Sequence, residues 1–256
     1  MKEIGLNLFS VRTLIDTEEK FLQTALVLKD MGYTYLQFSG APFDADKIAR
    51  VSKAANLPVY LTHVPMDRIL NDTEKLMEEH AKFGCKNIGL GMMPVDVITD
   101  EVQCKKTVEA LNLAGEMMQR NGFAFFYHHH HYEFFKHGKE SVFDYILKNA
   151  PYISFTADTY WLQYGGVSIE DTVSRLQGRV GCVHLKDYKI DKKQEGNGLE
   201  PRFAPVGEGN IDFQKAVKAF KAAGAEYFFV EQDDACSYED PLGQVKSSVE
   251  YIKKEL

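Results

Sequence analysis

Three acidic or imidazole side chains close short apolar stretches in the second half of the chain. Asp158 follows "ISFTA", His184 follows "VGCV" and Glu231 follows "YFFV". Carboxylate oxygens with one imidazole nitrogen suit a hard or borderline divalent cation, and an open site of this kind polarises a carbonyl and orients a vicinal diol. A single Asp or His at a strand end is often only a helix cap, but three in equivalent positions favour a functional site.

The stretch "FYHHHHYEFF" (126–135) adds four consecutive histidines to the candidate residues. The run lies in the middle of the chain between globular segments, so it is not an affinity tag. Alternate side chains of a strand face opposite ways, so His128 and His130 share one face while His129 and His131 share the other. All four imidazoles therefore cannot reach one ion.

Apolar stretches typical of strands alternate with amphipathic helical stretches from end to end of the chain. The expected strands are 4–9, 33–38, 59–64, 86–91, 123–129, 153–158, 180–185 and 227–232, and the expected helices are 17–30, 44–54, 72–83, 100–120, 140–148, 168–177, 211–222 and 241–254. A glycine- and charge-rich loop is expected at 187–209. Eight repeats in 256 residues predict a single-domain (β/α)8 TIM barrel over 1–256. A doubly wound open sheet is the alternative, although the first turn lacks the GxGxxG fingerprint of that fold.

In a TIM barrel the active site lies at the carboxyl ends of the strands. The polar residues at or just beyond these ends are Asn7, Ser10, Gln37, His63, His128 to His131 followed by Glu133, Asp158, His184, Lys186 and Glu231. The fourth strand ends only in glycine and methionine. The barrel therefore predicts that candidate ligands from separate repeats meet at one mouth.

Composition restricts the class of protein and of partner. Hydrophobic residues make up 45% of the chain and charged residues 26%, as in ordinary soluble globular proteins. A net charge of −7 without a basic stripe disfavours a nucleic-acid partner. Four cysteines without a CxxC pair favour reduced thiols and a cytoplasmic location. No stretch approaches the ~20 apolar residues of a membrane helix, and the N-terminus is read as a strand rather than a signal peptide.

Five motifs, in order along essentially the whole chain, resemble those of the xylose isomerase-like TIM barrels. This sugar phosphate isomerase/epimerase superfamily also includes inosose dehydratases, endonuclease IV and AP endonuclease family 2 proteins. The stretch "GLNLFSVR" (5–12) resembles G-L-Q-L-Y-S-V-R, and "YHHHHYEF" (127–134) resembles Y-H-N-H-x-x-E-F. The later motifs are "DTYWLQYGG" (158–166) for D-x-x-W-x-x-x-G, "VHLKD" (183–187) for the seventh strand, and "VGEGNIDF" (206–213) for V-G-x-G-x-I-D-F.

The resemblance implies one divalent metal ion, which would be Mn²⁺, Mg²⁺, Co²⁺ or Zn²⁺. It implies Glu133, Asp158, His184 and Glu231 as the ligands. The strand-end argument reaches the last three independently, whereas Glu133 comes from the resemblance alone and lies beyond the expected end of the fifth strand. Glu133 and Glu231 are also implied as the catalytic acid and base.

Five further residues are candidates for contact with the substrate: His63, His128, His130, Trp161 and Lys186. The resemblance places His128 and His130 in the pocket, as substrate hydrogen-bonding groups or as supports for the ligands; the alternative is that they only cap the strand. Trp161 is suited to stacking on a sugar, or to anchoring its loop. Lys186 and His63 each have a functional and a structural interpretation as well. Lys186 is suited to stabilising a substrate oxygen, or to pairing with Asp187 in solvent.

These residues predict a metal-dependent isomerase or epimerase that acts on a ketose or keto-sugar. The ion would bind the carbonyl and a neighbouring hydroxyl, one glutamate would remove the adjacent proton to give a metal-stabilised enediolate, and the other would return it. A dehydratase or lyase acting on a keto-inositol or 3-keto-glycoside is the alternative, because its first step is the same. No cluster of Arg, Lys and Ser marks a phosphate site, which favours a non-phosphorylated substrate.

Two more distant alternatives belong to other functional classes. An endonuclease IV-like DNA-repair enzyme uses about three zinc ions, but the fourth strand here lacks a histidine, and Trp161 stands where a further histidine would follow Asp158. A non-catalytic sugar-binding barrel would not need two carboxylates facing an ion. The expected partner is a small-molecule sugar or polyol, without nucleic acid or membrane, and the expected assembly is a homodimer or homotetramer.

Overall fold

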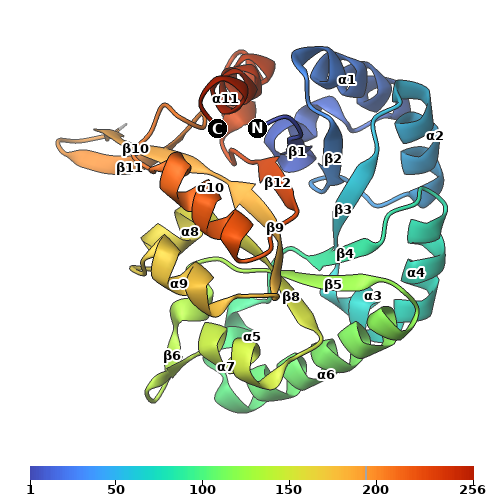
Figure 1. Cartoon of the computed structure of the whole chain (residues 1–256), viewed down its shortest axis with the longest axis vertical. Helices are drawn as coiled ribbons and strands as arrows, with labels where there is room; N and C mark the ends of the chain where they lie inside the picture. Colours follow the sequence, from blue (N-terminus) through green and yellow to red (C-terminus); the bar gives the residue numbers. More distant parts are fainter. Residues whose placement is uncertain (194) are drawn as a thin grey trace.

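The computed structural model describes residues 1–193 and 195–256. Eight parallel strands close into a barrel in the order β1-β12-β9-β8-β5-β4-β3-β2 (Figure 1). They are β1 (Gly5–Asn7), β2 (Tyr35–Phe38), β3 (Val59–Val64), β4 (Asn87–Leu90), β5 (Ala124–His128), β8 (Ile153–Asp158), β9 (Val180–Leu185) and β12 (Tyr227–Val230). Most of their residues are buried, which is why the strands read as nearly continuous apolar runs. The predicted TIM barrel is confirmed, and the open doubly wound sheet is excluded.

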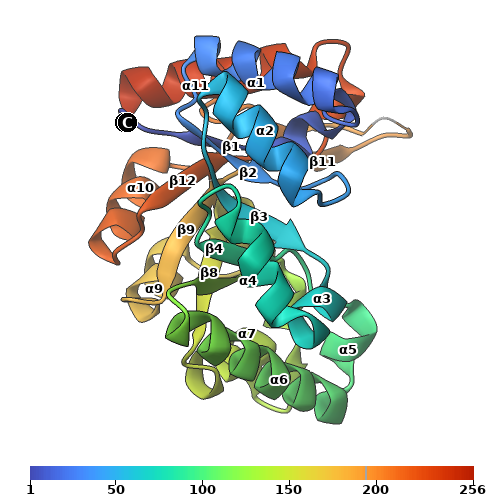
Figure 2. The ribbon, with the colours of Figure 1, turned by 90° about the vertical axis from the view of Figure 1, so that its right-hand side faces the viewer.

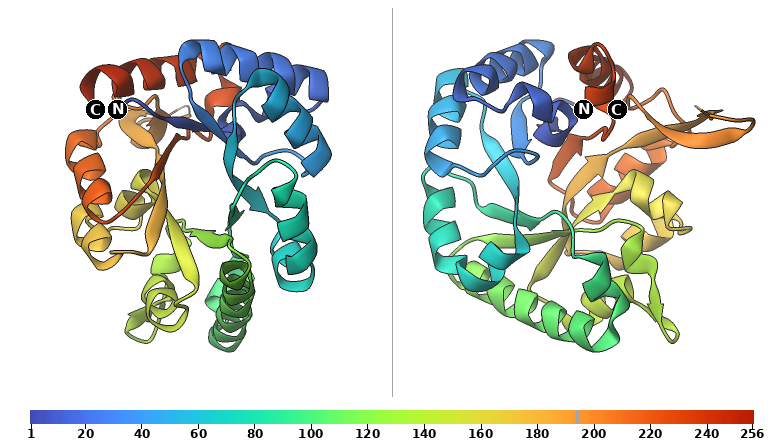
Figure 3. Two further views of the ribbon diagram at one scale, coloured as in Figure 1. Left: turned by 45° about the vertical axis from the view of Figure 1, so that its right-hand side comes forward. Right: turned by 180° about the vertical axis from the view of Figure 1, so that it is seen from behind.

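Helices surround the barrel, as Figures 2 and 3 show. The longer ones are α1 (Glu18–Met31), α2 (Ala45–Ala55), α4 (Thr73–Ala81), α6 (Glu101–Arg120), α7 (Val142–Asn149), α9 (Ile169–Arg175), α10 (Phe213–Ala222) and α11 (Pro241–Glu255). Their ends follow local signals. In α1, the Thr17 side chain accepts a hydrogen bond from the Lys20 amide, and Gly32 ends the helix with a left-handed φ of 101°. Every predicted helix is present.

The sequence did not predict several short elements. They are η1 (Leu8–Leu14), α3 (Met66–Asn71), α5 (Val95–Thr99), η2 (Tyr132–Phe134), α8 (Thr159–Tyr164) and η3 (Ala235–Ser237), with the small strands β6 (Lys136–His137) and β7 (Glu140–Ser141). The expected loop at 187–209 was wrong for most of its length, because β10 (Asp187–Lys192) and β11 (Leu199–Ala204) form an antiparallel hairpin that projects from the barrel in Figure 1. Charged and glycine residues obscured its strand pattern; residue 194 of that loop lies outside the described residues.

The barrel interior is filled in layers that follow from the two-residue period of a strand. One layer is apolar and consists of Tyr35, Leu61, Phe126, Cys182 and Phe229. Two residues further along the same strands, the side chains are Gln37, His63, His128, His184 and Glu231. Gly5 makes room for the apolar layer, since a Cβ at this position would lie 2.4 Å from the Tyr35 ring. A polar layer therefore rests on an apolar one.

The two ends of the chain meet where the barrel closes. The Met1 ammonium donates to the Ile252 carbonyl of α11 at 3.2 Å, and both termini lie close together in Figure 1. β1 pairs with both β2 and β12, which completes the ring of strands. Among the described residues, no helix combines the length and the apolar character that crossing a membrane requires.

Candidate metal centre and substrate pocket

Four side chains from four strands converge at the carboxyl end of the barrel. His128 and Asp158 end β5 and β8, His184 lies in β9, and Glu231 directly follows β12. One ligand atom from each lies within 4.8 Å of the others. His184 Nδ1 is 2.7 Å from Glu231 Oε2, and His128 Nε2 is 3.5 Å from Asp158 Oδ2. We call these four residues the tetrad.

Both imidazoles of the tetrad are held by their outer nitrogen. The Nδ1–H of His128 donates to the carbonyl of Gly91 at 2.9 Å, since a carbonyl can only accept. The Nε2–H of His184 donates to Oε1 of Gln37 at 2.7 Å. The inner nitrogen of each ring is buried and faces a carboxylate of the tetrad, Asp158 for His128 and Glu231 for His184. When a ring held in this way is neutral, the lone pair of its inner nitrogen points at the centre of the tetrad, as in histidines that bind metals.

The two carboxylates of the tetrad are arranged in the same way. Asp158 Oδ1 accepts the Trp161 amide at 2.9 Å and so caps α8, while Glu231 Oε1 accepts from Asn7 Nδ2 at 2.6 Å. The other oxygen of each carboxylate is buried and faces the centre of the tetrad, within ion-pair distance of the Lys186 ammonium. Two carboxylate oxygens and two imidazole nitrogens thus converge on one point, and this set of donor atoms fits a divalent cation.

Lys186 lies beside the tetrad with its ammonium fully surrounded by carboxylates. Its Nζ is 2.9 Å from Glu231 Oε2, 3.2 Å from Asp158 Oδ2 and 3.0 Å from Asp233 Oδ1. When His184 is neutral, as a metal ligand must be, three carboxylates against one ammonium leave two negative charges at the site. One divalent cation neutralises that charge, which is a second indication that the residues fit a metal ion.

The tetrad perturbs the protonation of its members. Burial alone would lower the pKa of His184, but the carboxylates of Glu231 and Asp158 outweigh it and raise that pKa to about 9. Burial would likewise raise the pKa of Glu231, whereas His184 and Lys186 hold it well below its usual range. Without an ion, His184 is therefore protonated at neutral pH beside an ionised glutamate, and a metal ion must displace this proton.

Glu133, which the resemblance implied as a ligand and catalytic group, does not lie in the tetrad. The short helix η2 turns its side chain back against β5, where Oε1 accepts from the Tyr127 hydroxyl and Oε2 from the His130 amide, both at 2.7 Å. The carboxyl group is fully buried, and burial raises its pKa. The structure thus brings Asp158, His184 and Glu231 together with His128 rather than with Glu133.

The histidine run divides among three environments. His128 and His130 line one cavity, on the face that alternation predicts. His129 packs outside the barrel, with its ring 5.4 Å from that of Phe143, and its Nε2 accepts the Asp158 amide at 3.1 Å. His131 stacks on Trp161 with ring centroids 5.2 Å apart. Only one histidine of the run therefore belongs to the tetrad.

A cavity of about 640 Å³ opens beside the tetrad, within the ~300–1,000 Å³ typical of small-molecule sites. Its polar side contains His63, His128, His130, Lys186, Glu231 and Asp233. Nε2 of His63 accepts a hydrogen bond from Nε2 of Gln37 at 3.0 Å when the His63 ring carries its proton on Nδ1. Trp161 stands close by, with its ring 5.2 Å from Lys186 Nζ and 5.0 Å from the ring of His130. The predicted substrate-contact residues thus gather around one cavity.

Three residues that support this site received no role from the sequence. Asn7 and Gln37 close their strands, but a neutral amide there gives no signal of its function as an anchor. Asp233 follows the end of β12 in a pair of aspartates, and only its contact with Lys186 distinguishes it from Asp234. Its position two residues after Glu231 was the one available indication.

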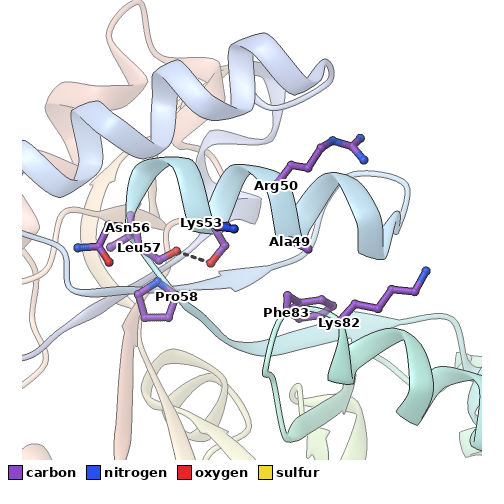
Figure 4. A pocket seen from close by; sticks show the side chains of 9 residues that line it. Ala49, Arg50, Lys53, Asn56, Leu57, Pro58, Lys82 and Phe83 are labelled. Atoms are coloured by element: carbon purple, nitrogen blue, oxygen red, sulfur yellow. Dashed lines mark hydrogen bonds between the residues drawn. The ribbon is translucent and has the colours of Figure 1, made fainter.

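A second hollow lies at the opposite end of the barrel, between α2 and α4 (Figure 4). The Arg50 and Lys82 side chains extend away from it in Figure 4. They pair instead with Glu18 at 2.7 Å and with Asp46 at 2.9 Å. The hollow precedes β3, far from the carboxyl ends of the strands where barrel active sites lie. We therefore assign it no part in the chemistry.

The chain is similar to several known proteins. An inosose dehydratase from Clostridium perfringens is 26% identical over 92% of this chain and 81% of its own length. The crystal structure of a sugar phosphate isomerase/epimerase from Parabacteroides distasonis is 25% identical with a TM-score of 0.78, covering 99% of this chain and 98% of the other. A xylose isomerase-like TIM barrel protein from Mycobacterium smegmatis in complex with magnesium is 13% identical with a TM-score of 0.74, covering 99% and 96%.

The match to a family model extends beyond these individual proteins. The model described as Xylose isomerase-like TIM barrel matches residues 26–255, from within α1 to the end of α11. The closed barrel and the order of the motifs agree with this match. The chain therefore belongs to the xylose isomerase-like TIM barrel family.

Proposed function

We propose that this protein is a metal-dependent enzyme that isomerises or epimerises a ketose or other keto-sugar. The observation that carries the proposal is the tetrad, whose two carboxylate oxygens and two imidazole nitrogens converge beside a cavity. His128, Asp158, His184 and Glu231 would hold the ion. Once bound, the ion supplies Lewis acidity that polarises a substrate carbonyl and acidifies the neighbouring C–H bond.

Glu231 is the tetrad carboxylate that lines the cavity, and we assign to it the removal of the proton beside the carbonyl. Asn7 fixes its side chain through Oε1. His130 faces the same cavity, and burial lowers its pKa, so that its imidazole is neutral and its Nδ1 is placed to hydrogen-bond a substrate hydroxyl group. Glu133 takes no part in this step because both its oxygens are engaged by Tyr127 and His130.

A dehydratase acting on a keto-inositol or keto-sugar is the second candidate, and Lys186 favours it. Burial would lower the pKa of this lysine, but Asp158, Asp233 and Glu231 outweigh burial and raise it well above the usual range. The resulting ammonium stays charged and lines the cavity, where it is placed to stabilise a leaving hydroxyl group by a hydrogen bond. The 26% identity to an inosose dehydratase supports this alternative, whereas the name of the Parabacteroides distasonis protein supports the first.

The experiment begins with metal analysis of the purified protein. The metal-loaded protein is then incubated with ketoses and keto-inositols in D₂O, and products are followed by NMR. We expect deuterium at the carbon beside the carbonyl, together with an epimer or isomer; loss of water would identify the dehydratase instead. The Glu231→Gln variant should lose label incorporation, while Glu109→Gln on the exposed face of α6 should retain it. Turnover without label from solvent would contradict proton abstraction.

A further inference from the structure

The cavity beside the tetrad has two chemically different sides. The tetrad and Lys186 occupy the side formed by β5, β8, β9 and β12. The opposite side is formed by residues at the ends of β1, β2, β3 and β4 or just after them, and it presents Phe9, Pro42, Val64, Met66, Leu90 and Met92. None of these six side chains carries a charge or a hydrogen-bonding group of ordinary strength. Two polar side chains, Ser39 and His63, also line the cavity from these strands; Ser39 donates to Asn7 and His63 bonds to Gln37. We call this side of the cavity the apolar wall.

The cavity offers no free cation to an anionic substrate. Lys186 is the sole Lys or Arg among the described residues that line it, and its ammonium is already within 3.2 Å of three carboxylates. Arg12 lies nearby, but its guanidinium donates to the carbonyls of Phe9 and Asp233 at 2.8 and 2.9 Å. A divalent ion in the tetrad only balances the remaining negative charge. A phosphate group bound here would therefore lack the Arg or Lys partners that recognise such groups.

The apolar wall also disfavours a fully hydroxylated substrate. Each hydroxyl group placed against these six side chains would lose hydrogen bonds to water and gain none from them. An apolar group in the same place gains from burial, and the flexible thioethers of Met66 and Met92 adapt to its shape. Met92 is 47% exposed, so its apolar surface is available to a ligand that enters from solvent.

We infer that the substrate is an uncharged keto-sugar with an apolar group at the end remote from its carbonyl. The inference rests on the proposed function for the orientation, in which the carbonyl lies at the tetrad and the far end reaches the apolar wall. A deoxygenated terminal carbon is the simplest group of this kind. Met66 and Met92 are then specificity-determining residues, whereas the tetrad binds the carbonyl end, which all ketoses share.

Matched sugars test this inference on the metal-loaded protein. The probes are D-fructose, D-tagatose and D-psicose, each with its 6-deoxy and 6-phosphate derivatives. Binding is measured by calorimetry, and label incorporation from D₂O is measured separately. In the series that binds best, the 6-deoxy sugar should bind about tenfold more tightly than its parent. The 6-phosphate should bind about a hundredfold more weakly.

A substitution in the apolar wall supplies the control. Met66→Lys places a cation there, which should remove the preference for the 6-deoxy sugar and strengthen binding of the 6-phosphate about tenfold. Met66→Leu keeps the wall apolar and should keep the preference, and thermal melts check that both variants fold.

The binding measurement and the label measurement together separate this inference from the proposed function. Preferential binding of the 6-deoxy sugar without label incorporation would support the apolar-wall assignment and refute the proposed reaction. Tightest binding of a 6-phosphate by the unmodified protein, with label incorporation, would overturn the inference and leave the reaction intact. Failure of every series to bind would overturn the inference as well.

Discussion

Each residue of the tetrad has one polar atom anchored by a group outside the tetrad and one that faces the other three members. Gly91 and Gln37 anchor the two imidazoles, and the Trp161 amide and Asn7 anchor the two carboxylates. This arrangement fixes the positions of the inward-facing atoms, which lowers the cost of ordering the side chains around an ion.

Paired substitutions distinguish His128 from Glu133 as the fourth ligand. We expect His128→Asn to weaken metal binding about 10- to 100-fold, because the ring nitrogen that faces Asp158 is lost. Glu133→Gln should leave metal affinity and stoichiometry unchanged, because its carboxyl group is engaged by Tyr127 and His130. Calorimetric titration with Mn²⁺ measures both. Loss of the ion from Glu133→Gln alone would instead support the ligand set that the motif resemblance implies.

Metal binding should depend on pH through His184. Its pKa of about 9 in the metal-free protein means that the ion displaces a proton at every pH below that value. Affinity should therefore rise about tenfold per pH unit toward pH 9, and calorimetry in buffers of different ionisation enthalpy should show release of about one proton. Fold stability of the metal-free protein should depend on pH in the opposite direction. The ion pair of protonated His184 with Glu231 stabilises the fold fully below about pH 6.5, and this stabilisation is lost as pH rises through about 9. A pH-independent affinity would contradict this account.

At the scale of elements, one carboxylate connects the hairpin to the following loop. Asp187 begins β10, directly after Lys186, and it is fully buried. Its oxygens accept the amides of Tyr188, Gly207, Gly209 and Ile211 at 2.8 to 3.2 Å. This explains the V-G-x-G-x-I-D-F motif: a Cβ at position 209 would lie 2.3 Å from Asp187 Oδ1, so only glycine allows its amide to approach.

We expect Asp187→Asn to destabilise the protein by about 1–3 kcal/mol, because an amide cannot accept all of these hydrogen bonds and presents a donor to other donors. Urea unfolding measures the effect. Asp191→Asn is the matched control in the same strand. Asp191 is exposed and accepts the Lys192 amide, so its effect should stay within about 0.5 kcal/mol. Equal stability of the two variants would show that Asp187 does not hold the loop.

At the scale of the whole molecule, the tetrad joins strands that are far apart in the sequence. A bound ion would connect β5, β8, β9 and β12, and it would neutralise the two excess negative charges around Lys186. Ligand binding to the folded state alone stabilises it, by about 4 kcal/mol when the free ion is at a thousand times its dissociation constant. We expect EDTA to lower the melting temperature and added Mn²⁺ to restore it. Glu231→Gln should show little response, and an unmodified protein that melts identically with and without the ion would argue against a metal centre.

The sequence by itself determined the barrel and three members of the tetrad. Alternation of apolar stretches with amphipathic ones, and the caps and glycine stops between them, are local properties that each repeat expresses without the others. Position at a strand end is equally local, so Asp158, His184 and Glu231 were recognisable as soon as the strands were. The hairpin in the 187–209 loop was not predicted, because its strands are polar and lack the apolar runs of the barrel strands.

Only the tertiary structure decided which atoms meet. The side chain of Glu133 turns toward Tyr127 because η2 reverses the chain after β5, a geometry that residue types do not encode in a simple pattern. His128 joins the tetrad, and Lys186 sits among three carboxylates, through contacts between strands from different repeats. The apolar wall likewise gathers six residues from the ends of four strands and the loops that follow them. Such contacts depend on the closed barrel, because only closure brings residues so distant in the chain to one mouth.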